Sequence, residues 1–178
     1  MFENPKDVMR IIKENMIDYD TAIILGGGDL GLERFTLDYD RVEVAYEWSD
    51  EHVKGMREAG LNAVKQDITK LKTIEADLVT LYDVLEHLTK KQALGLLKCI
   101  KAKQIMMFIP IQPEYRKGHR DLIKEQEEKK GNNEQLTHHL SLWTPEELEG
   151  LGFTVLYKEG YHKKHNGWGA AICWKNNK

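Results

Sequence analysis

The chain has few cysteines, few prolines and no long hydrophobic run. Cys99 and Cys173 are the two cysteines among 178 residues. Both lie in apolar segments, so we expect reduced core thiols in a cytoplasmic protein rather than a disulfide framework. The apolar runs are far shorter than the ~20 residues that a membrane-spanning helix needs. The N-terminal residues also lack a basic start followed by an apolar stretch, so we expect neither a signal peptide nor a membrane partner.

Charge is nearly balanced, with a formal net charge of −3. This balance gives no electrostatic reason to expect a nucleic-acid partner. The composition, 41% hydrophobic and 31% charged, is typical of a globular protein. At 178 residues the chain is most simply a single domain, residues 1–178, around one core. The oligomeric state stays open.

Hydrophobic spacing and capping residues predict helices that alternate with strands. Helices are expected over residues 5–17, 29–36, 49–60 and 90–101. Strands are expected over residues 21–26, 41–47, 61–64, 77–82 and 104–109, and Pro110 is expected to stop the last of these. Such alternation favours a parallel sheet with right-handed crossovers. The C-terminal part differs, because a short helix from Thr144 is followed by strands over residues 153–161 and 168–174. Asn166-Gly167 predicts a turn between these two strands and hence an antiparallel hairpin.

A glycine-rich turn follows the first predicted strand. Gly26, Gly28 and Gly31 have the spacing of a dinucleotide-binding fingerprint, and the next strand ends in Glu47. Glycines allow the backbone to approach a ligand closely. A following helix can direct free N–H groups at an anion, and a carboxylate after the second strand can accept hydrogen bonds from a ribose diol. The pattern therefore predicts a ligand that contains a nucleoside.

Two cofactors are compatible with this turn. A nicotinamide dehydrogenase would continue with a second parallel half, whereas a methyltransferase would end in an antiparallel strand and carry a second acid, here Asp67, after the third strand. With these features and the segment Asp83-Val84-Leu85-Glu86-His87-Leu88, the chain resembles the class I S-adenosylmethionine-dependent methyltransferases of small-molecule type over residues 20–174. The resemblance implies an α/β, Rossmann-like fold. The sheet would have seven mostly parallel strands and a C-terminal antiparallel hairpin, with helices on both faces.

The resemblance also implies a cofactor site. By position, its residues would be Gly26, Gly27 and Gly28 in the turn, Glu47 on the ribose hydroxyls, Trp48 or Ile68 on the adenine ring, Asp67 on the adenine amino group, and Tyr82 and Asp83 near the sulfonium. The chain departs from the family at two positions. Ile24 stands where the family has an acid for the methionine amino group, and Leu30 stands where it has a third glycine. Asp29 is a candidate replacement for the missing acid.

Three histidines are candidates for a general base toward a hydroxyl acceptor, namely His87, His138 and His139, because an unperturbed histidine titrates near neutrality. For His87 the alternative is a structural hydrogen bond at a helix start. The segment His138–Trp143 also resembles small-molecule members of the family. The spacing of His138, His139, His162 and His165 matches no zinc pattern, so no metal site is predicted.

Residues 113–143 are predicted to form an insertion over the strand ends, either a lid or a solvated helix without a role. The expected function is methyl transfer from S-adenosylmethionine to an oxygen or nitrogen of a small-molecule acceptor. Two alternatives remain at this stage. One is a non-catalytic S-adenosylmethionine-binding regulatory or partner protein, and the other is an NAD-dependent dehydrogenase.

Overall fold

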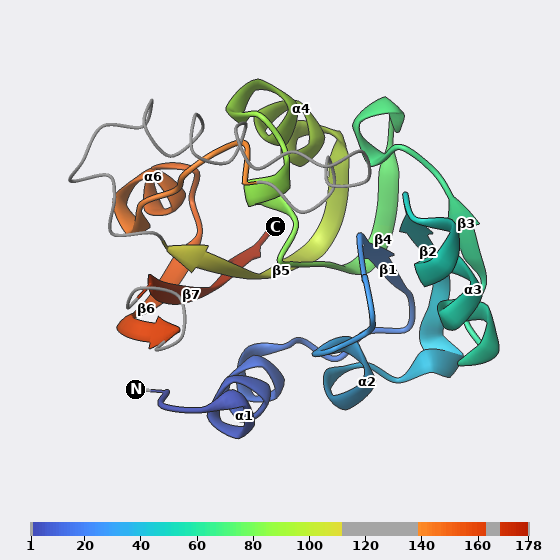
Figure 1. The fold of residues 1–178 in the computed structure, drawn as a ribbon, viewed down its shortest axis with the longest axis horizontal. Coiled ribbons are helices and arrows are strands. Elements are labelled where there is room, and N and C mark those ends of the chain that lie inside the picture. The colour runs from blue at the N-terminus through green and yellow to red at the C-terminus, as the bar shows by residue number, and fades with distance from the viewer. Residues whose placement is uncertain (1, 112–138, 163–167, 178) are drawn as a thin grey trace.

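A computed structural model describes residues 2–111, 139–162 and 168–177. Its sheet has seven strands in the order β3-β2-β1-β4-β5-β7-β6 (Figure 1). The strands are β1 (Ala22–Leu25), β2 (Val42–Glu47), β3 (Ala63–Lys65), β4 (Ile74–Tyr82), β5 (Ile100–Ile111), β6 (Thr154–His162) and β7 (Trp168–Asn176). The first five run parallel, and β7 is antiparallel to both β5 and β6. The predicted fold class is therefore confirmed. The predicted turn at Asn166-Gly167 lies outside the described residues.

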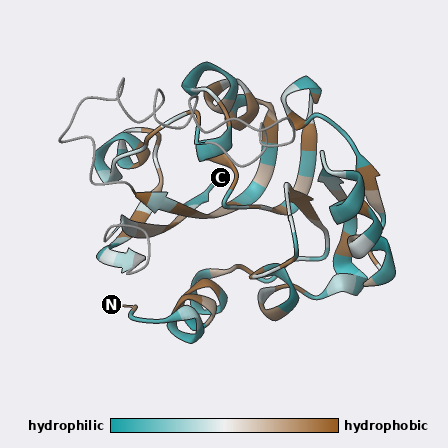
Figure 2. Ribbon diagram, in the orientation of Figure 1, coloured by the Kyte–Doolittle hydropathy of each residue, from teal (hydrophilic) through white to brown (hydrophobic). Residues whose placement is uncertain are grey.

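Helices cover both faces of the sheet. They are α1 (Pro5–Asn15), α2 (Glu33–Thr36), α3 (Asp50–Glu58), α4 (Lys90–Cys99) and α6 (Pro145–Gly150). Buried residues of α1 and α3 form one core cluster with the sheet, whereas α4 and α6 form a second cluster on the opposite face. Figure 2 shows hydrophobic residues concentrated along the central strands between these layers. Such burial on both faces is typical of parallel sheets.

Side-chain caps fix where the helices begin. The Asn4 side chain accepts hydrogen bonds from the first turn of α1, and Ser49 does the same for α3. Thr89 and Thr144 each form a capping box with the residue three positions later, so backbone N–H groups that lack helical partners are satisfied. These caps explain why the predicted starts of α1, α3, α4 and α6 are close to those observed.

The structure corrects the prediction that Pro110 stops its strand. β5 continues to Ile111, and Pro110 pairs in register with Ala170 of β7. The carbonyl of Phe108 accepts from Asp83 N–H and so points toward β4. Because directions alternate along a strand, the nitrogen of Pro110 also points to that side, where β4 has already ended at Tyr82. The missing N–H of proline therefore costs no ladder hydrogen bond.

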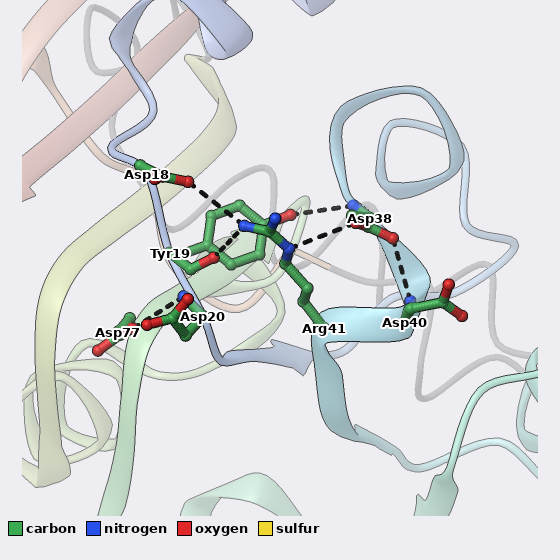
Figure 3. A network of polar contacts seen from close by, with 7 residues as sticks. All are labelled: Asp18, Tyr19, Asp20, Asp38, Asp40, Arg41 and Asp77. Carbon is green, nitrogen blue, oxygen red and sulfur yellow. Dashed lines mark hydrogen bonds and ion pairs between the residues drawn. The ribbon is translucent and has the colours of Figure 1, made fainter.

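A polar network at the amino edge of the sheet joins the segments that lead into β1 and β2 to Asp77 of β4 (Figure 3). The Arg41 guanidinium donates to the carbonyl of Tyr19 and forms ion pairs with Asp18 and Asp38. The Tyr19 hydroxyl accepts from the backbone N–H of Asp38. Since these contacts lie at the opposite edge from the predicted site, they stabilise the fold rather than form part of that site.

Two further expectations concern the cysteines and the membrane. Cys173 is buried and Cys99 is half-buried, and neither is in a disulfide. Burial raises the pKa of the Cys173 thiol to about 12, so the thiol stays protonated. In the part of the chain that the structure describes, no helix has the length and apolar character to cross a bilayer.

Candidate functional site

The predicted cofactor residues lie at one edge of the sheet, because parallel strands end there together. β1 leads into the glycine turn, β2 ends at Glu47, and β4 ends at Tyr82. The backbone N–H of Gln66, just after β3, donates to the Glu47 carbonyl, which brings the ends of β2 and β3 side by side. Ligands of open α/β sheets occupy this carboxyl edge.

Each glycine of the turn has its own structural reason. Gly26 and Gly28 have φ angles of +68° and +50°, which favour glycine. A Cβ on Gly27 would lie 2.9 Å from atoms of both Ile24 and Met56, so Gly27 faces the core. A Cβ on Gly28 would meet nothing within 4 Å, so this face of the turn is open. Gly28 is therefore the position where a ligand can approach the backbone.

Leu30 adopts the backbone conformation that a glycine would favour, with a φ angle of +60°. Its side chain is 4% exposed and belongs to the core, so packing compensates for a strained backbone. The helix that was predicted from residue 29 begins only at Glu33 and has four residues. It is too short to serve as an anion site, so the ligand contacts of this turn come from the turn itself.

Glu47 binds the backbone around it. One carboxylate oxygen, Oε1, accepts from the N–H groups of Trp48 and Ser49 at 2.8 and 2.9 Å. The other, Oε2, accepts from Gly28 N–H at 3.1 Å. The side chain thus joins the end of β2 to the glycine turn. A carboxylate oxygen has two lone pairs, so Oε2 keeps one for a ligand hydroxyl.

Asp67 follows β3 and caps the short 3₁₀ helix η2 (Ile68–Lys70). Its Oδ1 accepts from the Thr69 N–H and hydroxyl at 3.0 and 2.6 Å, and Lys70 lies 3.3 Å from Oδ2. Hydrogen bonds from Thr69 lower the pKa of Asp67, so the group is anionic at neutral pH. Trp48 is 49% exposed at the adjacent strand end, and Ile68 is half-buried beside Asp67.

Tyr82 and Asp83 point to different environments at the end of β4. Tyr82 is 5% exposed and packs in the core with α1 and α3, rather than lining an open cleft as expected. Asp83 is exposed and has a φ angle of +53°, an uncommon conformation that aspartate tolerates. The protein around Asp83 and the charge of Asp29 raise the pKa of its carboxyl, although its contact with water moderates this effect. Asp83 is therefore the strand-end side chain that is open to a ligand.

Ile24 and Asp29 differ in whether their side chains can reach a ligand. Ile24 is fully buried in the core, so its position offers no group to a ligand. Asp29 is exposed in the glycine turn, and its charge acts on Asp83. The two acids together make this part of the edge negative.

A second group of side chains lies just beyond β4. Glu86 and His87 belong to the 3₁₀ helix η3 (Leu85–His87), and His139 comes from a segment distant in sequence. One ligand atom from each of the three lies within 4.8 Å of the others. The two imidazoles meet edge to face with centroids 5.1 Å apart. The structure thus brings together two of the three predicted histidines, while His138 and most of the predicted lid, residues 113–143, lie outside the described residues.

The backbone around His139 is docked onto η3. The N–H groups of Leu140 and Ser141 both donate to the Glu86 carbonyl, at 2.6 and 3.1 Å. The Ser141 hydroxyl donates to the Leu85 carbonyl and accepts from the Trp143 indole N–H. The predicted His138–Trp143 motif therefore has a structural role as well, because its serine and tryptophan hold His139 at the strand end.

Glu86 was not among the candidate site residues predicted from the sequence. It is 2% exposed, and among the described residues neither of its carboxylate oxygens has a hydrogen-bond partner. Burial and the charge of Asp83 raise the pKa of Glu86 well above its usual range. The Glu86-His87 dipeptide was visible in the sequence, but its proximity to His139 was not.

A hollow of about 650 Å³ lies elsewhere, at the amino ends of β4 and β5, where it is lined in part by Thr21, Asp77, Lys101 and Lys175. None of the predicted site residues lines it. The carboxyl edge is therefore the better candidate, because the glycine turn and the acids are located there.

Comparison with known proteins relates this geometry to solved structures. No family model and no curated protein match the sequence. The PH0226 protein from Pyrococcus horikoshii OT3 is similar over 97% of this chain and 89% of its own, with a TM-score of 0.64 and 15% identity. A SAM-dependent methyltransferase from Archaeoglobus fulgidus is similar over 97% and 95% of the two chains, with a TM-score of 0.58 and 17% identity.

The small RNA methyltransferase HEN1 is similar over 98% of this chain but 25% of its own, with a TM-score of 0.57 and 15% identity. This chain has the class I methyltransferase fold. At these identities the similarity establishes the fold alone, so activity has to be argued from the residues at the carboxyl edge.

Proposed function

We propose that the protein is an S-adenosylmethionine-dependent methyltransferase that acts on an oxygen or nitrogen of a small metabolite. The observation that carries this proposal is the set of residues at one edge of a methyltransferase-type sheet. Gly28, in the turn after β1, has an open face, and Glu47, Asp67 and Asp83 lie at or just beyond the ends of β2, β3 and β4. Each of these four residues is proposed to bind one part of S-adenosylmethionine.

The residues fit S-adenosylmethionine in both shape and charge. The open face of Gly28 leaves room for close approach, and Oε2 of Glu47 keeps a lone pair for a ribose hydroxyl. Asp67 is an anionic acceptor for the adenine amino group, beside the exposed ring of Trp48. Asp29 and Asp83 suit the positively charged ammonium and sulfonium groups of the methionine part. Asp29 would thus replace the acid that Ile24 does not provide.

When bound, S-adenosylmethionine supplies a methyl group on a sulfonium that is already a good leaving group. The protein then has to align the acceptor with the methyl carbon and exclude water, which is worth several kcal/mol of barrier. His87 and His139 are near the end of β4, where they can accept a proton from a hydroxyl acceptor. A small acceptor is favoured over RNA, because the chain has a net charge of −3 and this edge carries several acids.

Thermal unfolding with two ligands tests the proposal. S-adenosylhomocysteine, the product form of the cofactor, should raise the melting temperature, because a ligand that binds only the folded state stabilises it by about 2.7 kcal/mol at 100 times its Kd. NAD should have no effect. Stabilisation by NAD alone would favour the dehydrogenase alternative. Binding of S-adenosylhomocysteine without methyl transfer to any acceptor in a metabolite extract would favour the non-catalytic alternative.

A further inference from the structure

Glu86, His87 and His139 have the donor atoms of a metal site. Two imidazoles and one carboxylate form a ligand set that zinc uses in catalytic sites. Their ligand atoms lie within 4.8 Å of one another, and His87 Nε2 is 3.9 Å from Glu86 Oε1. Ligands at metal distances of about 2.0–2.2 Å are roughly 3–3.5 Å apart. Small side-chain rotations would therefore bring the three atoms around one cation.

The environment of Glu86 independently favours a bound cation. Its side chain is 2% exposed, and among residues 2–111, 139–162 and 168–177 neither carboxylate oxygen receives a hydrogen bond. A buried carboxylate that accepts no hydrogen bond is costly, and native proteins pair such groups with donors, cations or metals. A cation bound here would provide both the charge and the ligand bonds that Glu86 lacks.

The backbone holds the two halves of this group together. Leu140 and Ser141 donate to the carbonyl of Glu86 itself, so His139 is tied to the residue whose carboxylate it approaches. The ring of Trp168, at the start of β7, lies 5.4 Å from the His139 ring. Ligands that hydrogen bonds and ring packing hold in place in this way need little reorganisation to bind a metal.

We propose that Glu86, His87 and His139 bind one zinc-type divalent cation. Imidazole ligands favour Zn²⁺ and other late first-row cations such as Co²⁺ over Mg²⁺ and Ca²⁺, which prefer oxygen ligands. The proposal departs from the sequence-based prediction of no metal, which rested on the spacing of histidines alone. Those spacings could not include Glu86, whose carboxylate is brought to His139 by the fold.

If the protein is a methyltransferase as proposed, the cation also has a role in methyl transfer, and this part of the inference rests on the proposed function. Three protein ligands leave at least one coordination position open, and the site begins three residues after Asp83, beside the proposed methyl donor. With both imidazoles bound to the cation, neither would serve as the general base, and a hydroxyl acceptor bound there would instead have a lowered pKa and release its proton to water. Its oxygen then forms a bond to the methyl carbon while the sulfur–carbon bond breaks, and sulfur keeps that electron pair. The substrate class is therefore a hydroxyl compound, and the reaction an O-methylation.

Metal titration of the full chain tests this site without measuring activity. Protein freed of metal with a chelator is titrated with Co²⁺, followed by visible absorption, and with Zn²⁺, followed by calorimetry. We expect one cation to bind per chain, and we expect this binding to require Glu86, His87 and His139. The variants Glu86→Gln and His139→Asn should each weaken binding by at least roughly 10-fold, a cost seen even for lost outer-shell partners. Glu75→Gln, an exposed glutamate at the amino end of β4, is the matched control and should bind as the wild type does.

The outcomes separate this proposal from the proposed function. Equal Zn²⁺ affinity in wild type, Glu86→Gln and His139→Asn would overturn the metal site, as would no binding by the wild type. If Glu86→Gln does not fold, His139→Asn decides the question. S-adenosylhomocysteine is titrated separately with a chelator present. If S-adenosylhomocysteine binds but the metal does not, the proposed function stands and the metal site is wrong. If the metal binds but S-adenosylhomocysteine does not, the metal site stands and the proposed function is wrong.

Discussion

Glu47 connects the end of β2 to the glycine turn through three backbone hydrogen bonds. We predict that Glu47→Gln weakens S-adenosylhomocysteine binding by at least about tenfold, because a hydrogen bond to a charged group is worth roughly 1.5–3 kcal/mol. The melting temperature should also fall, since an amide NH₂ would face a backbone donor. Calorimetry and thermal unfolding measure the two effects.

The matched control for Glu47 is Glu43→Gln, which changes an exposed glutamate on the same strand. It should leave both cofactor affinity and melting temperature unchanged. If Glu47→Gln bound S-adenosylhomocysteine as tightly as the control, Glu47 would be a structural residue and the ribose would lie elsewhere.

Glu33 gives the protein a specific dependence on pH. It is 2% exposed in the first turn of α2, where burial first of all, and then the charges of Asp83 and Asp29, raise its pKa to about 8 from an ordinary value of 4.5. Between these two pH values the unfolded chain loses a proton that the folded chain keeps. Stability from this group therefore falls as pH rises through that window and levels off above it.

We predict that Glu33→Gln removes this dependence. The unfolding free energy of Glu33→Gln minus that of the wild type should increase by on the order of a few kcal/mol between pH 5 and pH 8. Urea unfolding at several pH values measures the difference, with Glu51→Gln as an exposed control. Curves that stay parallel for wild type and Glu33→Gln would show that Glu33 is already ionised in the folded protein.

At the scale of elements, two glycines of the turn have different roles, one in folding and the other in ligand binding. Gly27 faces the core, where a Cβ would lie 2.9 Å from Ile24 and Met56, whereas Gly28 faces open space. We predict that Gly27→Ala lowers the melting temperature, because overpacking costs about 1–3 kcal/mol. Gly28→Ala should cost about 1 kcal/mol for its positive φ angle but weaken S-adenosylhomocysteine binding strongly, because the new methyl group occupies the approach.

Gly55→Ala is the control for both glycine variants. Gly55 lies within α3, and a Cβ added there would meet no atom within 4 Å, so alanine should stabilise the helix by roughly 0.5–1 kcal/mol. Cofactor affinity should not change. If Gly28→Ala bound the cofactor like Gly55→Ala, the open face of the turn would not be the ligand's side.

For the whole molecule, local patterns predicted the fold well because each one has a local cause. Caps at Asn4, Ser49 and Thr144, helical spacing of apolar residues and alternating strands located the elements. The end of β5 was missed because its tolerance of a proline depends on where the neighbouring β4 stops. That is a tertiary fact, and no local pattern carries it.

In the candidate site, too, residues whose position has a local cause could be predicted, and those that depend on tertiary contacts could not. The position of Glu47, Asp67 and Asp83 at one edge of the sheet could be predicted because each lies at or just beyond the end of a strand, and parallel strands end together. Tyr82 was expected near the sulfonium but lies in the core, because β4 is buried on both faces and a position at the strand end does not decide between core and cleft. The group around Glu86 depends on a contact with a segment more than 50 residues away, held by Ser141.

Hydrogen exchange with S-adenosylhomocysteine tests the central claim most directly, because it reports where the cofactor binds. The account predicts slower exchange in residues 25–31, 46–49, 66–69 and 82–84, which join at the carboxyl edge, since a bound ligand suppresses local opening. Residues 75–77 and 101–103, beside the hollow at the amino ends of β4 and β5, should not change. Protection confined to that hollow, or no protection under conditions that saturate binding, would contradict the account.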